Sequence, residues 1–408
     1  METQNKTSAE LLAAKALAGQ LKKELTGNIL PYWMNMIRNQ TGSFYGRVDG
    51  KDEIDASAPV GSIMTARILW TFASAYRIIE KTDEKLSKDC LEMAVLAKNI
   101  LKDKFIDKKF GGVYWALNPD MSPYDTKKQV YAIAFAIYGL AEFNRATGDT
   151  EALDLARNLF HSIEAHCSDQ KNNGYFEAFT QDWKAIDDMR LSDKDANECK
   201  SMNTHLHILE AYTCLYRVWK DPLLKKRLTS LISIFEEHII GKDHHLRLFF
   251  NDDWDCGYDI ISYGHDIEAS WLMEEAAIVL DDPDITTRIR ALVPKVVASA
   301  SEGFSPDGAM IYEKHGNRYD KDRHWWVQAE SVVGYFNLWD RHGIEEGLEN
   351  ALLCWEFIKS HLIDTRQGEW FWSILADGSV NRRDDKAGFW KCPYHNGRMC
   401  MEIIERMM

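Results

Sequence analysis

Residues 130–140 read VYAIAFAIYGL, and this stretch decides the fold class. It contains no charged residue and no proline, and its apolar side chains would point in almost every direction around a helix. A helix of this kind is buried on all sides, as it is when it packs between a ring of outer helices and a central cavity. The stretch therefore predicts an inner helix of a helical barrel.

The residues before this stretch show the complementary pattern of an outer helix. Met93, Ala97 and Ile100 fall on one face of a helix, whereas Lys98 and Lys102 fall on the other. A single apolar face is typical of a helix that covers the core from outside. The two patterns together predict a repeating pair of one inner and one outer helix.

Short segments rich in glycine and aromatic residues recur along the chain at intervals of roughly 60 to 70 residues, a spacing that accommodates a helical pair and a hairpin. Six such units predict an all-α fold, an (α/α)6 barrel with short β-hairpins at one mouth. We expect one catalytic domain over residues 1–408 with flexible first residues. An open solenoid is less expected, because solenoid repeats are usually shorter and rarely carry a hairpin. The segments are residues 42–46, 111–115, 174–176, 246–250, 308–312 and 368–372.

Composition and charge exclude several classes of partner. The 408 residues are 45% hydrophobic and 27% charged, as in a globular protein with a sizeable core, and the net charge of −14 disfavours nucleic acids and anionic membrane surfaces. The polar first residues lack the pattern of a signal peptide, and no apolar run is long enough to cross a bilayer. The 8 cysteines form no C-x-x-C pair. We expect a cytoplasmic protein with reduced thiols.

Polar residues follow the hairpins, where the inner helices begin. Arg67 lies among apolar neighbours, which is unusual for a surface arginine. Asn203 and His207 are four residues apart and share a helical face, whereas His205 points elsewhere. Because the inner helices of a closed barrel begin at the same mouth, these side chains are expected to line one pocket.

The last three inner helices repeat this feature. His265 and Glu268 share a face of the fourth, and Trp326 and Glu330 share a face of the fifth. The sixth begins in the segment WKCPYHNGR at residues 390–398, whose proline suits a helix start. Histidines, glutamates and arginines at equivalent places in different repeats indicate a functional pocket rather than isolated surface residues.

The residue types suit a sugar. Tryptophan faces pack on the C–H faces of pyranose rings, and Asn, Arg and Glu satisfy hydroxyls. Two opposed imidazoles could remove and return the proton at C2 beside the aldehyde of an opened sugar, which inverts C2 without a cofactor. Arg67 could stabilise the enediolate oxygens.

Other chemistries remain open at this stage. A glycoside hydrolase would use Glu268 and Glu330 as its two carboxyl groups. An aldose–ketose isomerase would share the enediolate and return the proton to C1. A metal site is disfavoured, because the cluster is rich in tryptophan and arginine, and a purely sugar-binding protein would not require three converging histidines.

Five blocks resemble the signature blocks of the N-acylglucosamine 2-epimerase superfamily: ARILW (66–70), MNTHLHILEAY (202–212), SYGHDIEASWL (262–272), WWVQAE (325–330) and WKCPYHNGRMCMEI (390–403). The similarity runs from about residue 42 to the C-terminus, and the last block is most similar to the cellobiose 2-epimerase branch. The resemblance implies C2 epimerisation at the reducing end of a β-1,4-linked disaccharide, with cellobiose as the expected substrate and lactose and mannobiose as further candidates. It implies no metal and no nicotinamide. A monosaccharide 2-epimerase of the same superfamily is the nearest alternative.

The resemblance also assigns roles to individual residues. His265 and His395 are the expected acid/base pair at C2, and His207 assists ring opening. Glu268, Glu330 and Arg67 complete the expected catalytic group. The expected substrate-binding residues are Asn203, Tyr114, Trp326, Trp390 and Arg398, with Trp390 as the platform for the second sugar. The sequence contains no signal for the oligomeric state.

Overall fold

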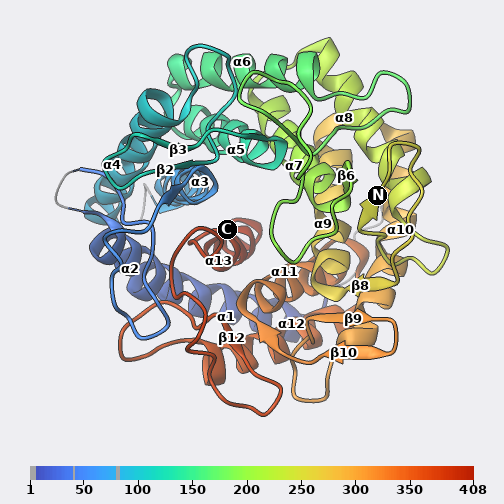
Figure 1. The fold of residues 1–408 in the computed structure, drawn as a ribbon. Helices are drawn as coiled ribbons and strands as arrows, with labels where there is room; N and C mark the ends of the chain where they lie inside the picture. The colour runs from blue at the N-terminus through green and yellow to red at the C-terminus, as the bar shows by residue number, and fades with distance from the viewer. Residues whose placement is uncertain (1–5, 40–41, 80–82) are drawn as a thin grey trace.

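The computed structural model describes residues 6–39, 42–79 and 83–408, and in it inner and outer helices alternate around one axis (Figure 1). The prediction of flexible first residues falls on residues 1–5, which lie outside the described part of the chain. The inner helices are α3 (Ser62–Ile79), α5 (Val130–Thr147), α7 (Met202–Val218), α9 (Tyr263–Leu280), α11 (Trp325–His342) and α13 (His395–Met407). The outer helices are α1 (Ser8–Glu24), α2 (Leu30–Tyr32), α4 (Glu84–Ile100), α6 (Thr150–His166), α8 (Pro222–Ile234), α10 (Pro283–Ala300) and α12 (Glu345–Phe357).

The inner helices form a closed ring. Each packs on the next in chain order, and α13 packs back on α3, so that the last repeat meets the first (Figure 1). The first outer segment, α1, covers α13. The predicted (α/α)6 barrel is therefore confirmed, and the open solenoid is wrong.

The predicted inner and outer patterns are both present. Every residue of α5 from Val130 to Phe143 is buried, whereas α4 buries a stripe that includes Met93, Ala97 and Ile100. Gly148 ends α5 with a left-handed backbone (φ +75°), a conformation that glycine adopts without strain. Asp149 then caps the N-terminus of α6 by accepting a hydrogen bond from the Ala152 amide. This order of residues turns the chain from the inner ring to the outer ring.

A hairpin follows each outer helix, at each of the six predicted segments. All six close through an antiparallel bridge at an equivalent place: Arg38–Phe44, Ile106–Val113, Ser168–Tyr175, Ile240–Leu246, Phe304–Met310 and Ile363–Trp370. The chain then reaches the next inner helix through short antiparallel strands at the mouth of the barrel. No helix in the described residues is long and apolar enough to cross a membrane.

The short strands tie each repeat to the next. The strand that precedes an inner helix pairs with a strand that follows the next hairpin, which brings the N-termini of the inner helices together around the mouth. The pairs are β1 (Val60–Gly61) with β2 (Ala116–Leu117), β4 (Lys128–Gln129) with β5 (Ala178–Phe179), β6 (Lys200–Ser201) with β7 (Phe249–Phe250), β8 (Ile260–Ser262) with β9 (Glu313–His315), and β11 (Arg323–His324) with β12 (Ser373–Ile374). Strands β3 (Pro123–Asp125) and β10 (Arg318–Asp320) extend two of these pairs.

Buried ion pairs reinforce three of the hairpins. In each, an aspartate of the hairpin turn accepts two backbone amides with one oxygen and a lysine ammonium with the other. In two of them the lysine lies two residues before an inner helix, so the pair fixes the start of that helix. The pairs are Asp107–Lys128, Asp169–Lys200 and Asp364–Lys386.

Candidate active site

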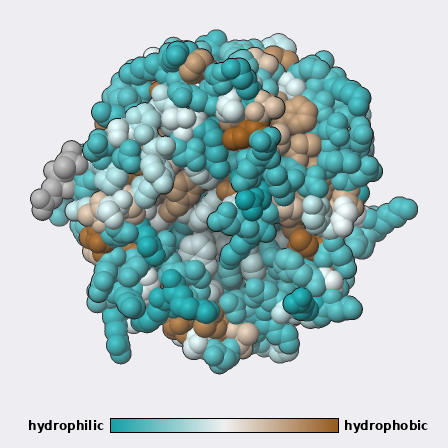
Figure 2. Space-filling view, in the orientation of Figure 1, coloured by the Kyte–Doolittle hydropathy of each residue, from teal (hydrophilic) through white to brown (hydrophobic). Residues whose placement is uncertain are grey.

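The mouth of the barrel leads into a cavity of about 870 Å³. Figure 2 looks into this mouth, where mostly hydrophilic residues surround the hollow near the centre. Eight of the residues predicted from the sequence line the cavity: Arg67, Asn203, His207, His265, Glu268, Trp326, Trp390 and His395. Ring closure therefore brings together side chains that are up to about three hundred residues apart in the chain.

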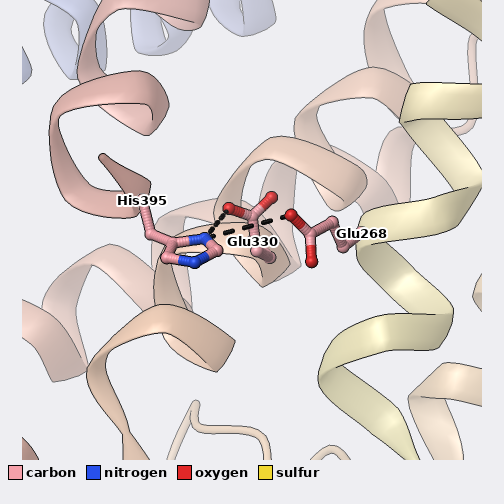
Figure 3. Close-up of side chains that lie close together, drawn as sticks. All are labelled: Glu268, Glu330 and His395. Carbon is pink, nitrogen blue, oxygen red and sulfur yellow. Dashed lines mark hydrogen bonds and ion pairs between the residues drawn. The ribbon is translucent and has the colours of Figure 1, made fainter. Parts of the chain in front are cut away.

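His395 is the first residue of α13, and its orientation is set by a carboxylate. Its Nδ1 lies 2.7 Å from Oε1 of Glu330 and 3.9 Å from Oε1 of Glu268 (Figure 3). Because a carboxylate accepts hydrogen bonds, Glu330 favours the tautomer with the proton on Nδ1. The lone pair of Nε2 then remains for a substrate.

His265 lies in the first turn of α9, and a hydroxyl holds its Nδ1. The distance from Nδ1 to Oγ of Ser262 is 2.7 Å. Its ring lies 4.7 Å from the ring of Trp326, centroid to centroid, and the ring of His395 lies 5.7 Å from the same indole. The two imidazoles therefore share Trp326 as a neighbour within one cavity.

Burial keeps both imidazoles neutral. Loss of hydration, and to a smaller extent nearby His207, lowers the pKa of His265 to about 3. The pKa of His395 is also well below its ordinary value, through burial first and then through the positive charges of Arg67 and Arg398. A neutral imidazole has the lone pair that a general base needs.

The third cavity histidine is His207, as its helical phase with Asn203 predicted. Its Nδ1 lies 2.9 Å from Oε2 of Glu210. A carboxylate therefore holds Nδ1 of this imidazole too, and its Nε2 remains available to the substrate. His205 lies behind the cavity wall, where its Nε2 accepts the backbone amide of Tyr175 and its Nδ1 lies 2.6 Å from the Ser201 carbonyl oxygen. The buried amide oxygen of Asn203 has no hydrogen-bond partner among the described residues and is available to a substrate hydroxyl.

Arg67 is buried in the cavity wall. One Nη donates to the hydroxyl of Tyr131 at 2.8 Å, and the other donates to the backbone carbonyl of Trp390 at 3.2 Å. The guanidinium also lies 4.2 Å from the ring of Phe135. The contact with Trp390 couples this positive charge to the segment that carries the predicted sugar platform.

The profile of the family described as N-acylglucosamine 2-epimerase matches residues 42–397, which is most of the chain. The chain belongs to the N-acylglucosamine 2-epimerase family.

Known relatives differ widely in their sequence identity to this chain. A cellobiose 2-epimerase from Bacteroides fragilis is 57% identical over 95% of this chain and 98% of its own length. The structure of a cellobiose 2-epimerase from Bacillus thermoamylovorans B4167 is 38% identical, superposes with a TM-score of 0.90, and matches 96% of this chain and 100% of that one. A D-mannose isomerase from Marinomonas mediterranea is only 20% identical, over 85% of this chain and 86% of its own.

In this member of the 2-epimerase family, Arg398 lies beneath the cavity and not in its lining. Its position favours a role in supporting the site over direct contact with a substrate. Its fully buried guanidinium donates to Oε1 of Glu268 at 2.5 Å and to Oε1 of Glu330 at 2.6 Å, and it also contacts Glu210 and the hydroxyl of Tyr394. Arg398 thus links the carboxylates that support His207 and His395. The cause is depth along the helix, because Arg398 lies three residues after His395, the first residue of α13, and so about 4.5 Å farther from the mouth.

The carboxylates around Arg398 differ in their protonation. Burial, and after it the neighbouring charge of Glu330, raises the pKa of Glu268 to about 7 although Arg398 acts in the opposite direction. Burial also tends to raise the pKa of Glu210, but Arg398 and His207 outweigh this effect and hold it at about 2. Glu210 was missed by the sequence analysis, although its position three residues after His207 on one helical face was an available signal.

Glu268, Glu330 and His395 are also the one group in the described residues whose donor atoms lie close enough to hold a metal ion, within 4.8 Å of one another. The guanidinium of Arg398 already lies against both carboxylates. A divalent cation there would face this positive charge at close range, which is unfavourable in a buried site. The residue set therefore suits a carboxylate–guanidinium network better than a metal.

Tyr114, expected from the sequence to bind substrate, does not line the cavity. Its ring lies 5.0 Å from Nζ of Lys128, beside the buried Asp107–Lys128 pair. Successive side chains of an extended segment point to opposite sides. The next residue, Trp115, is the one whose ring lies 5.9 Å from that of Trp390.

Part of the cavity wall comes from residues that no sequence pattern marks as site residues. Residues 189–196, in the loop between β5 and β6, line one side, and Gln129 anchors this loop by donating to the carbonyl oxygens of Met189 and Arg190. His324 and Tyr312 line the mouth near α11. Neither group has the helical periodicity that marked the other site residues, so only their three-dimensional position shows their relation to the cavity.

Proposed function

We propose that this carbohydrate epimerase acts at C2 of the reducing-end sugar of a β-1,4-linked disaccharide and converts cellobiose to glucosyl-mannose. The observation that carries the proposal is the pair of neutral imidazoles, His265 and His395, beside one indole in a single cavity. The 57% identity to a cellobiose 2-epimerase over nearly the whole chain supports the disaccharide substrate, with lactose and mannobiose as further candidates.

The reaction begins with opening of the reducing-end ring. Nε2 of His207 takes the proton of the anomeric hydroxyl and returns a proton to the ring oxygen, which gives the open-chain aldehyde. Glu210, 2.9 Å from Nδ1, stabilises the imidazolium that forms in this step. The unpartnered amide oxygen of Asn203 accepts a substrate hydroxyl.

Inversion at C2 then needs a base on one face and an acid on the other. One imidazole takes the C2 proton, the C–H electrons form the C1–C2 double bond, and the aldehyde oxygen becomes negative. The other imidazole, which takes up a proton from solvent on Nε2 before this step, delivers it to the opposite face of C2 and returns to its neutral form as the aldehyde re-forms. The guanidinium of Arg67 stabilises the negative oxygen of the enediolate.

The network below the cavity orients this pair. Glu330 holds Nδ1 of His395 at 2.7 Å and stabilises its protonated form, in the way that a buried carboxylate supports a catalytic histidine. Arg398 fixes Glu330 and Glu268 together. No step of this reaction requires a metal or a nicotinamide.

A hydrolase is disfavoured by the position of the two glutamates. A glycosidase needs its two carboxyl groups on either side of the scissile bond. Glu268 and Glu330 instead bind one guanidinium through Oε1, and Glu330 lies behind His395, outside the cavity lining. An aldose–ketose isomerase shares the enediolate, so the identity of the product has to decide between these two reactions.

Incubation with cellobiose in heavy water tests the proposal. The expected product, identified by chromatography and NMR, is glucosyl-mannose with deuterium at C2. His265→Ala and His395→Ala should each lower turnover by at least about a hundredfold, because each removes a positioned acid or base. Their circular dichroism should match that of wild type.

Three other products would contradict the proposal. Glucosyl-fructose would indicate an isomerase, and free glucose would indicate a hydrolase. Glucosyl-mannose without deuterium would indicate an oxidised intermediate in place of proton exchange with solvent.

We also propose that the barrel is one catalytic domain and that the enzyme is cytoplasmic. All 8 cysteines are unpaired in the structure, as is typical of proteins from a reducing compartment.

A further inference from the structure

His324 occupies a distinctive place at the mouth of the cavity. It is the last residue of β11 and directly precedes α11. Its imidazole lies flat on the ring of Tyr312, with centroids 3.9 Å apart and an angle of 6° between the planes. The residue is 7% exposed and lines the cavity. The stack fixes the plane of the imidazole without using either of its nitrogens.

Neither ring nitrogen of His324 has a hydrogen-bond partner among the described residues. The four other buried histidines near the cavity differ in this respect, because His205, His207, His265 and His395 each bond a carboxylate, hydroxyl or backbone group. Buried polar groups normally have partners, so this one is available to a ligand. Burial lowers the pKa of His324 to about 3, and the neutral ring presents one donor and one acceptor.

The position of His324 relative to the proton-transfer pair indicates which part of a ligand it meets. Tyr312, on which it stacks, lies 6.3 Å from Trp326, and Trp326 contacts both His265 and His395. The rings of Tyr312 and Trp326 therefore lie between His324 and the two proton-transfer histidines, and His324 lies nearer the mouth.

Trp390 approaches the cavity from the opposite wall. Its ring lies 6.2 Å from that of Tyr131 on α5, whereas His324 precedes α11. In the ring of six inner helices, α5 and α11 are three places apart and face each other across the axis (Figure 1). A sugar unit that extends from C2 toward the mouth would pass between Trp390 and His324.

We propose that His324 is a substrate-binding residue that hydrogen-bonds a hydroxyl of the sugar unit that is not epimerised. This inference rests on the proposed disaccharide substrate. A neutral imidazole with one donor and one acceptor matches a hydroxyl, which can accept and donate in turn. Tyr312 holds the imidazole in the plane from which it meets that hydroxyl, while Trp390 contacts the opposite side of the same sugar.

Two substitutions of His324 separate hydrogen bonding from packing. His324→Phe keeps a flat ring on Tyr312 and removes both nitrogens, whereas His324→Gln keeps a donor and an acceptor and removes the ring. We expect His324→Phe to raise the KM for cellobiose about three- to tenfold, the effect of one lost hydrogen bond, with kcat close to that of wild type. His324→Gln should raise KM less than His324→Phe does.

A matched control is available outside the cavity. His238 also stacks on an aromatic ring, that of Trp254, at 4.8 Å and 12°, and it is not part of the cavity lining. His238→Phe should leave both KM and kcat unchanged. Thermal unfolding of all three variants checks that the KM values refer to folded protein.

The outcomes are distinct. An unchanged KM in His324→Phe, or a larger rise in His324→Gln than in His324→Phe, would overturn the proposal, because the imidazole would then act only by packing. A fall in kcat at constant KM would also overturn it. If wild-type enzyme does not epimerise cellobiose, the proposed function itself fails, and the role of His324 fails with it. If wild type is active, the ratio of the variant and wild-type KM values tests His324 alone.

Discussion

The three imidazoles at the reacting end of the cavity share one arrangement, in which a neighbour holds Nδ1 and Nε2 remains for the substrate. The neighbour is a carboxylate for His395 and His207 and a hydroxyl for His265. A carboxylate stabilises an imidazolium more strongly than a hydroxyl does. At the residue scale, the three imidazoles therefore present the same nitrogen to the substrate and differ in the group that holds the other nitrogen.

The pair His205 and His207 offers a test at this scale, since only one of them reaches the cavity. His207→Ala should lower kcat by about a hundredfold, because ring opening loses its acid/base group. His205→Gln should keep kcat close to wild type and lower the melting temperature, because His205 bonds Ser201 and the Tyr175 amide inside the wall. Steady-state kinetics and calorimetry of both variants measure this. A large loss of kcat in folded His205→Gln would contradict the assignment.

At the scale of elements, the buried aspartate–lysine pairs connect hairpins to the starts of inner helices. Asp107 accepts the amides of Lys109 and Phe110 and the ammonium of Lys128, two residues before α5. Although burial alone would raise the pKa of Asp107, Lys128 and the other donors hold it at about 2. Both side chains are fully buried, so the loss of one partner would leave an uncompensated charge.

Lys128→Met should therefore lower the free energy of unfolding by about 3–5 kcal/mol. The double variant Asp107→Asn, Lys128→Met should be more stable than Lys128→Met alone, because it removes the unpaired charge as well. Lys88→Met is the surface control, since Lys88 forms an exposed pair with Glu84 on α4. Urea unfolding measures all three. Equal stability of Lys128→Met and wild type would show that the pair does not hold the hairpin.

At the scale of the whole molecule, the two ends of the barrel are chemically different. At the end opposite the mouth, ion pairs join the last turns of neighbouring inner helices: Arg77 of α3 pairs with Glu142 of α5 at 2.9 Å and with Glu405 of α13 at 2.5 Å. Glu142 is nearly inaccessible to solvent. These contacts close that end, so the cavity opens at the hairpin mouth.

The buried histidines also make the whole fold sensitive to acid. Burial lowers the pKa values of His205 to about 4 and of His265 and His324 to about 3, and it lowers that of His395. Below pH 6.5, the ordinary histidine value, the unfolded chain binds protons at these four sites and the folded chain does not. Each histidine therefore reduces stability by about 1.4 kcal/mol per pH unit as the pH falls from 6.5 toward its folded pKa.

Buried carboxyl groups act in the opposite direction. Burial raises the pKa values of Glu177 and Glu268 to about 7, so the folded chain takes up their protons as the pH falls through 7, before the unfolded chain does. His205 acts on the destabilising side of this balance. We expect the melting temperature of His205→Gln to fall less, or to rise more, than that of wild type as the pH is lowered from 6.5 to 4.5. Calorimetry across this range measures both slopes, and parallel slopes would contradict the role of His205.

The sequence alone determined the architecture and much of the cavity, because local periodicity records which faces of a helix are buried. The apolar residues 130–140 identified an inner helix, the glycine-rich segments identified the six hairpins, and helical phase with Asn203 selected His207 over His205. The two helical inferences need only neighbours within about four positions on one helix, and the hairpins need only the recurrence of similar short segments along the chain. They do not depend on which helices meet.

Only the tertiary structure decided what the cavity residues do to one another. Arg398 lies below the cavity, and the ring of Tyr114 lies beside Lys128. His324 lines the cavity although its own segment shows no helical periodicity. The bond between His395 and Glu330 spans 65 positions in the chain, and that between Arg398 and Glu268 spans 130. Such contacts arise from ring closure, which sets the distance between side chains on different helices, and the periodicity of a single helix carries no information about that distance.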